Sequence, residues 1–351
     1  MQEASQPLLW MPKGWGWRLL LLVLVLALLF VVDLSLGAVA IPYGSILEIL
    51  TGTPAENKVW EQILWEFRLP KALTALAAGS ALAVSGLQMQ TLFRNPLAGP
   101  FVLGISSGAS LGVAVLLMAG SIGWLIVPEW IPWLTAGAAA LGAAGVLVLI
   151  FLAALRLQDS MALLILGLMV GSLAGAVVSV LQFYSGAEKV QAYMIWTFGS
   201  LGGVTWPELQ VVLPVVVVGL VLAQALAKPL NALLLGERYA SSVGVSMGKV
   251  RPLILISTSL LAGSITAFCG PIAFVGLAVP HLCRLLFHIS DHRLLLPVVM
   301  LGGAILLLLC DILANILAAG GALPLNAITT LFGAPVVLWL ILRQRAIGKM
   351  F

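Results

Sequence analysis

Residues 104–108 (GISSG) match G-x-S-x-G, a pattern that can hold a nucleophilic serine. Such a serine works at a sharp turn between a strand and a helix, with a histidine as its base. Here Ser106 and Ser107 instead begin an apolar, helix-like run, and the three histidines lie much further along the chain, at 281, 288 and 292. Helix packing explains these glycines better, and an intramembrane serine hydrolase is kept only as the weakest alternative.

His288 and His292 are four residues apart, which is the spacing of two metal ligands on one helix face. They lie among Arg284, Asp291 and Arg293. Solvation at the end of a membrane span accounts for both histidines without a metal, so we predict no metal site.

The sequence has no nucleotide-binding P-loop. That loop needs a glycine at a fixed distance before Gly-Lys and a serine or threonine after it. The Gly-Lys pairs at 248–249 and 348–349 have neither feature. The chain is therefore predicted to be no enzyme and to bind no cofactor. If ATP drives it, ATP and Mg²⁺ must bind a separate partner chain.

Few ionisable residues fall within the long apolar runs. Asp33 and Asp311 do, each near one end of its run. Ion-coupled carriers need buried ionisable groups although each costs roughly 2.5–3.5 kcal/mol at a helix centre. The scarcity disfavours an ion-coupled secondary transporter, which remains the main alternative function.

The composition is that of a membrane protein, because 62% of the 351 residues are hydrophobic and 9% are charged. Soluble domains carry about 25% charged residues, and a helix needs roughly 20 apolar residues to cross the bilayer core. Runs of about this length predict an all-α membrane protein with about ten transmembrane helices in a single domain, residues 1–351. The predicted spans are 18–40, 71–92, 101–120, 133–155, 161–183, 208–227, 252–269, 272–288, 294–316 and 326–342.

Two further segments are ambiguous in the sequence. Residues 191–206 are apolar but broken by glycines, which favours a partial or re-entrant helix. Near the N-terminus, basic residues precede the apolar run 19–32, and 38–40 (AVA) resembles a cleavage site, as in a signal peptide. The run is long enough to span, so it is taken as the first membrane helix.

The charge distribution predicts the orientation. With the N-terminus in the cytoplasm, four of the 17 basic residues (Lys58, Arg68, Lys71 and Lys189) fall outside. Most acidic residues of the loops also fall outside. Cytoplasmic loops are enriched in Lys and Arg, so both termini are expected in the cytoplasm.

The segment 228–251 is the longest predicted cytoplasmic connection. It is expected to form two short amphipathic helices broken near Gly236 and Gly244. Its apolar side chains need a partner surface, which is either the bilayer or a cytoplasmic protein that receives a helix. Elsewhere, glycines spaced by four are expected to pack helices closely, at positions 104, 108, 112 and 167, 171, 175.

A series of segments resembles permeases of the FecCD-like family of type II ABC importers, which move ferric siderophores, haem and cobalamin. The segments occur in family order over nearly the whole chain, and together they are far more specific than any one of them. They are 68–71 (RLPK), 86–90 (GLQMQ), 94–100 (RNPLAGP), 103–109 (LGISSGA), 196–201 (WTFGSL), 235–237 (LGE), 270–277 (GPIAFVGL), 280–284 (PHLCR), 291–293 (DHR) and 333–335 (GAP).

The resemblance implies a ten-helix permease that pairs with a second copy, most simply as a homodimer. A periplasmic or surface binding protein would deliver substrate to Arg68, Lys71 and the position of Asn315. Two cytoplasmic ABC ATPase subunits would dock on the 228–251 loop, and polar residues of the motifs would lie along the pathway. The coupling residues would be Leu233, Leu234, Leu235, Gly236, Glu237, Tyr239, Val243 and Gly244, and the pathway residues Gln88, Asn95, Pro96, Ser106 and Ser107.

Two positions depart from the family pattern at the predicted outer surface. Asn315 stands where the family has an arginine, and Ala322 stands where it has a glutamate. Docking of the binding protein is therefore expected to be rearranged there. Asn95 is also expected to end a helix, because the residue before a proline avoids the α region.

The sequence therefore predicts the permease subunit of an ATP-driven importer in the bacterial cytoplasmic (inner) membrane, in contact with lipid and with no nucleic acid. It does not decide between a siderophore, haem and a corrinoid as substrate.

Overall fold

The structure is a computed structural model that describes residues 14–37, 39–52, 57–119, 130–156, 160–318 and 323–342. Seven of its helices are long and apolar enough to cross a membrane. They are α1 (Trp15–Ser35), the continuous helix Lys58–Leu92 that contains α4 (Leu69–Leu92), α6 (Ile131–Ala154), α7 (Ser160–Tyr184), α9 (Trp206–Ala225), α12 (Met247–Cys269) and α14 (His292–Leu317).

Three shorter apolar helices complete the set. They are α5 (Ile105–Ala114), which the π-helical turn η3 (Val115–Ala119) continues, α13 (Val275–Phe287) and α15 (Leu325–Leu342). All ten coincide with predicted spans, so the prediction of an all-α membrane protein with about ten helices is confirmed.

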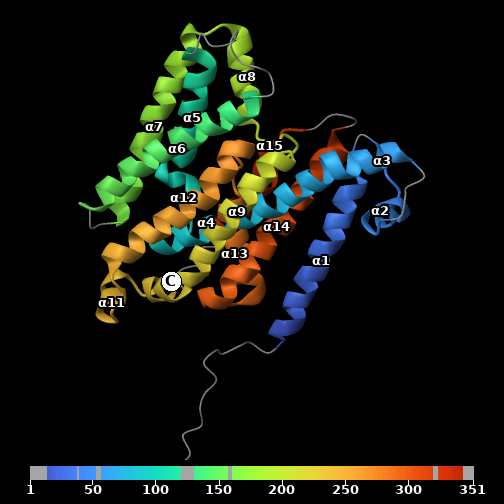
Figure 1. The fold of residues 1–351 in the computed structure, drawn as a ribbon. Helices are drawn as coiled ribbons and strands as arrows, with labels where there is room; N and C mark the ends of the chain where they lie inside the picture. The colour runs from blue at the N-terminus through green and yellow to red at the C-terminus, as the bar shows by residue number, and fades with distance from the viewer. Residues whose placement is uncertain are drawn as a thin grey trace, which may run out of the picture.

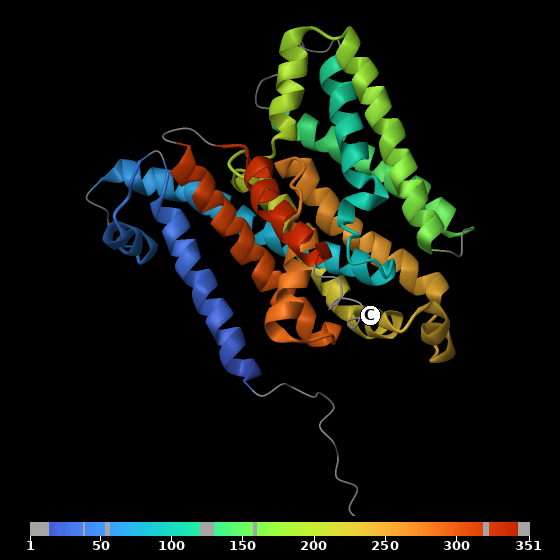
Figure 2. The ribbon, with the colours of Figure 1, turned by 180° about the vertical axis from the view of Figure 1, so that it is seen from behind.

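The helices form two groups that meet along α12. Helices α5, α6 and α7 stand together with the short α8 (Ala187–Thr197), whereas α1, α4, α9, α13, α14 and α15 make up the other group (Figures 1 and 2). Helix α12 packs against α5 and α6 on one side and against α4 and α9 on the other.

Helix α4 lies at the centre of the second group, and almost all of its side chains are buried. It is built largely of small residues, which let neighbouring backbones come close. A Cβ atom on Gly79 would overlap the carbonyl oxygen of Gly303 on α14, and one on Gly86 would overlap that of Gly276 on α13. Glycine at these positions is what allows α4 to pack against both helices.

Most of the glycines that were predicted to pack helices do so. A Cβ on Gly108 would approach Gly142 of α6, and one on Gly167 would overlap the backbone near Val102. Gly175 is different, since a Cβ there would meet nothing within 4 Å. The repeat therefore marks a packed face along α5 but only along the first half of α7.

The second span begins earlier than the predicted residue 71. Helix α3 (Lys58–Gln62) and the π-helical turn η1 (Ile63–Arg68) run into α4 without a break. Pro70 lacks an N–H group and its ring crowds the preceding turn. We attribute the wider π-helical turn just before it to this crowding, because such a turn keeps the helix continuous. Arg68 and Lys71 therefore lie inside a long helix, whereas the sequence placed them at its end.

Of the two forms predicted for residues 191–206, the structure has the partial helix. They comprise the end of α8 and a loop in which Gly199 has a φ of +69°. The loop is held against the end of α12, where Ser200 N donates to the carbonyl oxygen of Cys269 at 2.8 Å. The predicted glycine break thus lies after the helix, at a turn that only glycine adopts easily.

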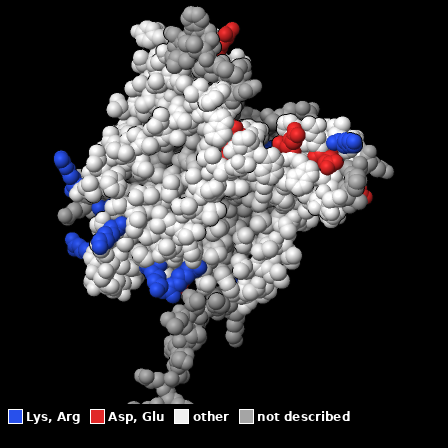
Figure 3. Space-filling view, in the orientation of Figure 1, with Lys and Arg blue, Asp and Glu red and all other residues white. Residues whose placement is uncertain are grey.

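Charged side chains separate along the long axis of the molecule. In Figure 3, basic side chains gather over the end that carries α10 (Ala227–Leu234) and α11 (Glu237–Ser242), and acidic ones gather toward α3 and α8. This separation fits the charge bias found in the sequence. That the basic end faces the cytoplasm remains a prediction.

Candidate functional site

The 228–251 segment folds as the sequence predicted. It forms α10 and α11 and then enters α12 at Met247. The breaks fall at Gly236 and Gly244, whose φ angles of +104° and +90° disfavour any residue with a side chain. Leu230 and Leu233 of α10 are fully buried, so the first helix is anchored in the core.

Three apolar residues of this segment are exposed. Leu235 precedes the break at Gly236 and Tyr239 and Val243 follow it, and the three residues are 63%, 47% and 55% exposed. Leu234 is half-buried and Gly236 is buried. We call Leu235, Tyr239 and Val243 the coupling row.

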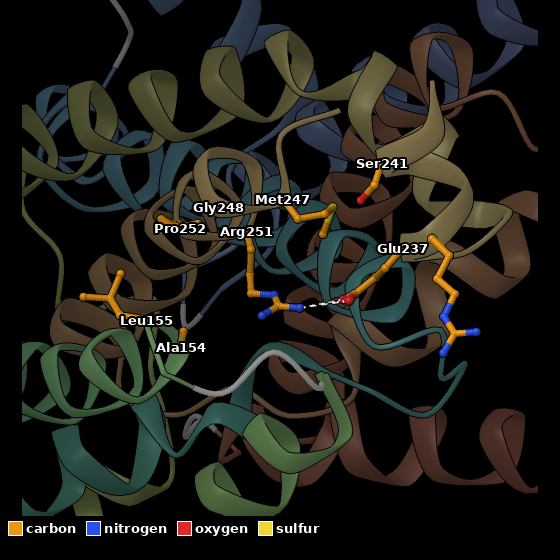
Figure 4. Close-up of a pocket in the computed structure, with 9 residues that line it drawn as sticks. Ala154, Leu155, Glu237, Ser241, Met247, Gly248, Arg251 and Pro252 are labelled. Carbon is orange, nitrogen blue, oxygen red and sulfur yellow. Dashed lines mark hydrogen bonds and ion pairs between the residues drawn. The ribbon is translucent and has the colours of Figure 1, made fainter. Parts of the chain in front are cut away.

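An ion pair fixes α11 to the start of α12. Arg251 Nη2 lies 2.8 Å from Glu237 Oε1 and 3.0 Å from Oε2, and Figure 4 shows the two side chains pointing toward each other. They line a pocket of about 620 Å³ that also includes Ala154 and Leu155 at the end of α6. The orientation of the coupling row therefore depends on a charged contact with a membrane helix.

The end of α4 lies directly behind the segment. Helix α4 stops at Leu92, as expected before Asn95-Pro96. Asn95 Oδ1 accepts from Leu97 N at 2.9 Å, and the carbonyl oxygen of Pro96 is 2.8 Å from His281 Nε2. These contacts hold the turn after α4 against α13.

Sequence reasoning missed a polar network at this end. Asn231 on α10 contacts His292 at the start of α14, and His292 in turn contacts Thr91 near the end of α4. The segment 291–293 was noticed as a family motif, but periodicity alone gives no sign that its histidine meets Asn231 and Thr91.

At the other end of the bundle, Arg68 is buried, with 8% of its surface exposed. Its Nη1 donates to the carbonyl oxygen of Leu34 at 2.7 Å, and its Nη2 donates to that of Val39. The guanidinium therefore satisfies one carbonyl group in the last turn of α1, which a helix terminus leaves without a partner, and one in the chain that follows.

Lys71 lies one turn further along and has a carboxylate partner. Its Nζ is 2.7 Å from Asp311 Oδ2 and 3.2 Å from Asn315 Oδ1, and Asn315 Nδ2 donates to the same carboxylate oxygen at 3.3 Å. Asp33 of α1 lies beside Asp311. The structure thus brings Lys71 and Asn315 together, whereas the Arg68 guanidinium bonds to the end of α1. Docking of a binding protein at these residues stays a prediction. Ala322 lies outside the described residues.

Gln88 is fully buried between three helices. Its Nε2 donates to Ser257 Oγ at 3.0 Å, its Oε1 accepts from Thr258 Oγ1 at 3.1 Å, and Ser257 Oγ also contacts the carbonyl oxygen of Gly219 at 3.0 Å. In this conformation Gln88 and Ser257 join α4, α9 and α12. A role of Gln88 along the pathway stays a prediction.

Ser106 and Ser107 lie half-buried in the first turn of α5. The element before them is a 3₁₀ turn, η2 (Pro100–Leu103), followed by Gly104 with a φ of +75°. A nucleophile elbow needs a strand in that place, so this geometry gives the G-x-S-x-G match no support as a hydrolase site.

The two histidines once considered as metal ligands lie on different elements. His288 caps α13 with a φ of 54°, and His292 begins α14. They do not share a helix face. Among the residues that the structure describes, no group of three or more His, Cys, Asp or Glu side chains is placed to hold a metal.

Comparison with known sequences decides the family. Residues 23–343 match the sequence model of the FecCD transport family. The chain belongs to the FecCD transport family. Among its relatives, the hemin transport system permease protein HmuU of Yersinia pestis is 38% identical over 325 residues, which cover 90% of this chain and 94% of HmuU.

Other FecCD-type proteins show the same extent of likeness. The vitamin B12 import system permease protein BtuC of Citrobacter koseri is 37% identical over 289 residues, covering 81% of this chain and 84% of BtuC. A metal-chelate type ABC transporter, solved in an inward-facing conformation, aligns with a TM-score of 0.81 at 30% identity and covers 93% of this chain and 99% of that one. The fold is therefore that of an ABC importer permease of this FecCD family.

Proposed function

We propose that this chain is the membrane-spanning subunit of an ATP-driven importer for a metal chelate or metal macrocycle. The observation that carries the proposal is the match of nearly the whole chain to FecCD permeases. Relatives whose names specify hemin and vitamin B12 indicate a substrate class of iron or cobalt complexes, which includes ferric siderophores. The location that follows is the bacterial inner membrane.

The coupling row is the proposed contact for the ATPase. Three exposed apolar side chains at a basic, water-facing end of a membrane protein need a partner that covers them. The row lies on short helices, which fit the helix-in-groove mode of recognition. Two ATPase subunits would bind ATP and Mg²⁺ and engage one row on each of two permease copies.

The proposed docking site for the binding protein is centred on Lys71, Asp311 and Asn315. Lys71 keeps 24% of its side chain exposed although Asp311 already pairs with it. An acidic group of the binding protein would compete with Asp311 for the ammonium group. Arg68 would act indirectly, because its bonds to the end of α1 fix the helix that carries Lys71.

Transport itself would require no bond chemistry. ATP-driven movement of α10 and α11 would shift the attached membrane helices and open the pathway alternately to each side. Ser106 and Ser107, half-buried at the start of α5, would line that pathway. Asn95 and Pro96 would set the turn between α4 and α5, and Gln88 would keep α4, α9 and α12 together.

The test is uptake by purified complexes in sealed proteoliposomes. The permease is co-expressed with the ATPase and the binding protein encoded by neighbouring genes, and the mass of the complex reports the number of each chain. Haemin, cyanocobalamin and a ferric hydroxamate siderophore serve as probes. The proposal expects uptake of at least one probe with ATP inside and none with a non-hydrolysable analogue. Uptake by the permease alone, driven by a proton or sodium gradient, would instead establish the secondary-transporter alternative.

A further inference from the structure

Helix α10 is joined to the start of α14 by a single amide side chain. Asn231 Oδ1 accepts from the backbone N–H of His292 at 2.8 Å and lies 2.8 Å from His292 Nδ1. Asn231 Nδ2 donates to Asp291 Oδ1 at 2.6 Å. Asp291 also caps α14, since the same oxygen accepts from Arg293 N at 2.9 Å.

The contact continues from α14 to α4 through the imidazole ring. His292 Nε2 lies 2.8 Å from Thr91 Oγ1, and both side chains are fully buried. One short chain of bonds therefore runs from the segment that carries the coupling row, through the first residue of α14, to the last turn of α4.

The chemistry of the bonded atoms shows which atom is the donor in each hydrogen bond. Asn231 Oδ1 can only accept, so His292 Nδ1 must carry the ring proton. Nε2 of the neutral ring is then an acceptor for the Thr91 hydroxyl. The single proton of that hydroxyl is shared with the carbonyl oxygen of Leu87, which lies 2.9 Å away in the preceding turn of α4.

Burial makes this network stiff. Water cannot replace a lost partner readily at side chains without exposed surface, so breaking either bond leaves a buried polar group unpaired. Helix α10 is also packed against α4 and α14, with Leu230 fully buried between them and the core. A displacement of α10 must therefore move the ends of α4 and α14 or break the network.

The two helices that receive the network are packed closely along their length. They approach so closely at Gly79 and Gly303 that no Cβ fits between them. At their far ends, Lys71 of α4 and Asp311 of α14 are joined by the 2.7 Å ion pair. Movement that enters at Thr91 and His292 is thereby passed to the proposed docking site for the binding protein.

We propose that Asn231 and His292 are positioning residues that link ATPase movement to α4 and α14. This inference rests on the proposed function, since it names the route by which the ATPase drives the same permease. It predicts that breaking the network separates ATP hydrolysis from transport while the ATPase remains bound.

The experiment compares Thr91→Val with Thr91→Ser in the complete transporter. Valine matches the shape of threonine but has no hydroxyl group, whereas serine retains it. Thr266→Val is the matched control, because Thr266 is also fully buried but bonds only within its own helix, to the carbonyl oxygen of Ala262. Measured quantities are co-purified ATPase, stimulation of hydrolysis by the loaded binding protein, and substrate transported per ATP.

Thr91→Val should retain the ATPase but transport about tenfold less substrate per ATP, within the range of about 5- to 150-fold typical of coupling between sites. Thr91→Ser should stay close to wild type, as should Thr266→Val. A change limited to yield or thermal stability is what a merely structural role would give. Unchanged substrate per ATP in Thr91→Val would overturn the proposal, and so would an equal loss in Thr266→Val.

Asn231→Ala provides a second, independent test. Asn231 is only half-buried, so its truncation disturbs the fold less if Thr91→Val fails to assemble. Its substrate per ATP should also fall, and the double variant should lose no more than the stronger single one, because both residues act through His292. An unchanged ratio, or fully additive losses, would refute the network. Absence of ATP-dependent uptake by the wild-type complex would refute the proposed function instead.

Discussion

Lys71 on α4 and Asp311 on α14 form an ion pair, with Nζ 2.7 Å from Oδ2, and the same two helices meet again where Thr91 Oγ1 lies 2.8 Å from His292 Nε2. About 20 residues separate the two contacts on each helix, which at 1.5 Å per residue is about 30 Å. That distance equals the thickness of the hydrocarbon core of a bilayer. One helix pair therefore connects the two ends at which partner proteins are proposed to bind.

Lys71→Gln should weaken docking of the binding protein. A partly exposed charge mainly affects association rate and its dependence on salt, so we expect affinity to fall by about tenfold (1.4 kcal/mol) at low salt and less at high salt. Biolayer interferometry on the transporter in nanodiscs measures both. Lys58→Gln is the matched control, since Lys58 is an exposed lysine on the same continuous helix. Equal affinity of wild type and Lys71→Gln at low salt would contradict docking at this site.

Arg68→Ala should act on the stability of the permease more than on docking. It removes the two bonds to the carbonyl oxygens of Leu34 and Val39, and a hydrogen bond from a charged group contributes about 1.5–3 kcal/mol. We expect a lower melting temperature of the purified permease, measured by the intrinsic fluorescence of its tryptophans. If stability is unchanged and affinity for the binding protein is lost, Arg68 contacts that protein directly.

Val243→Asp should release the ATPase. Val243 is 55% exposed and needs an apolar partner surface under the proposal, and a carboxylate in such an interface is strongly unfavourable. We expect normal membrane insertion, little co-purified ATPase and no uptake. Leu50→Asp is the control, because Leu50 is also an exposed apolar residue but belongs to α2 (Tyr43–Leu50), which lies on the opposite side of the molecule from α11 in Figure 1. Wild-type recovery of the ATPase with Val243→Asp would place the contact elsewhere.

Ser106→Ala should keep substantial uptake. Ser106 begins a helix and is not at a nucleophile elbow, so its hydroxyl is expected to have no covalent role. The measurement is the rate of uptake of the accepted probe per assembled complex, together with labelling by an active-site serine probe. Complete loss of uptake in a normally assembled complex, with labelling of the wild type, would revive the hydrolase interpretation.

The sequence alone was sufficient to predict the class of protein and the positions of most of its helices. Apolar length located ten apolar helices, seven of which are long enough to cross a membrane, because a bilayer requires a minimum length of a span. Gly236 and Gly244 located the breaks of the coupling segment, because a positive φ is a local property of the backbone. The ordered family segments predicted the FecCD family, which the comparisons confirmed.

Sequence patterns did not predict the partners of a side chain where those partners come from another helix. Arg68 and Lys71 have nearly the same sequence context, yet one is buried on backbone carbonyl groups and the other pairs with Asp311. The two residues lie about one turn apart on a similar face of the helix, so their different partners depend on which segment packs beside each turn. The apparent end of the second span at residue 71 was also wrong, since the helix passes Pro70 through a π-helical turn.

Sequence alone thus determined which segments enter the membrane, where the coupling segment bends and which family the chain resembles, since length, hydropathy and backbone preference are local. Only the tertiary structure decided that Asn231, His292 and Thr91 form one network and that Gln88 is enclosed by α9 and α12. These residues lie up to 201 positions apart, and their contacts exist only because small residues let α4 pack closely against its neighbours.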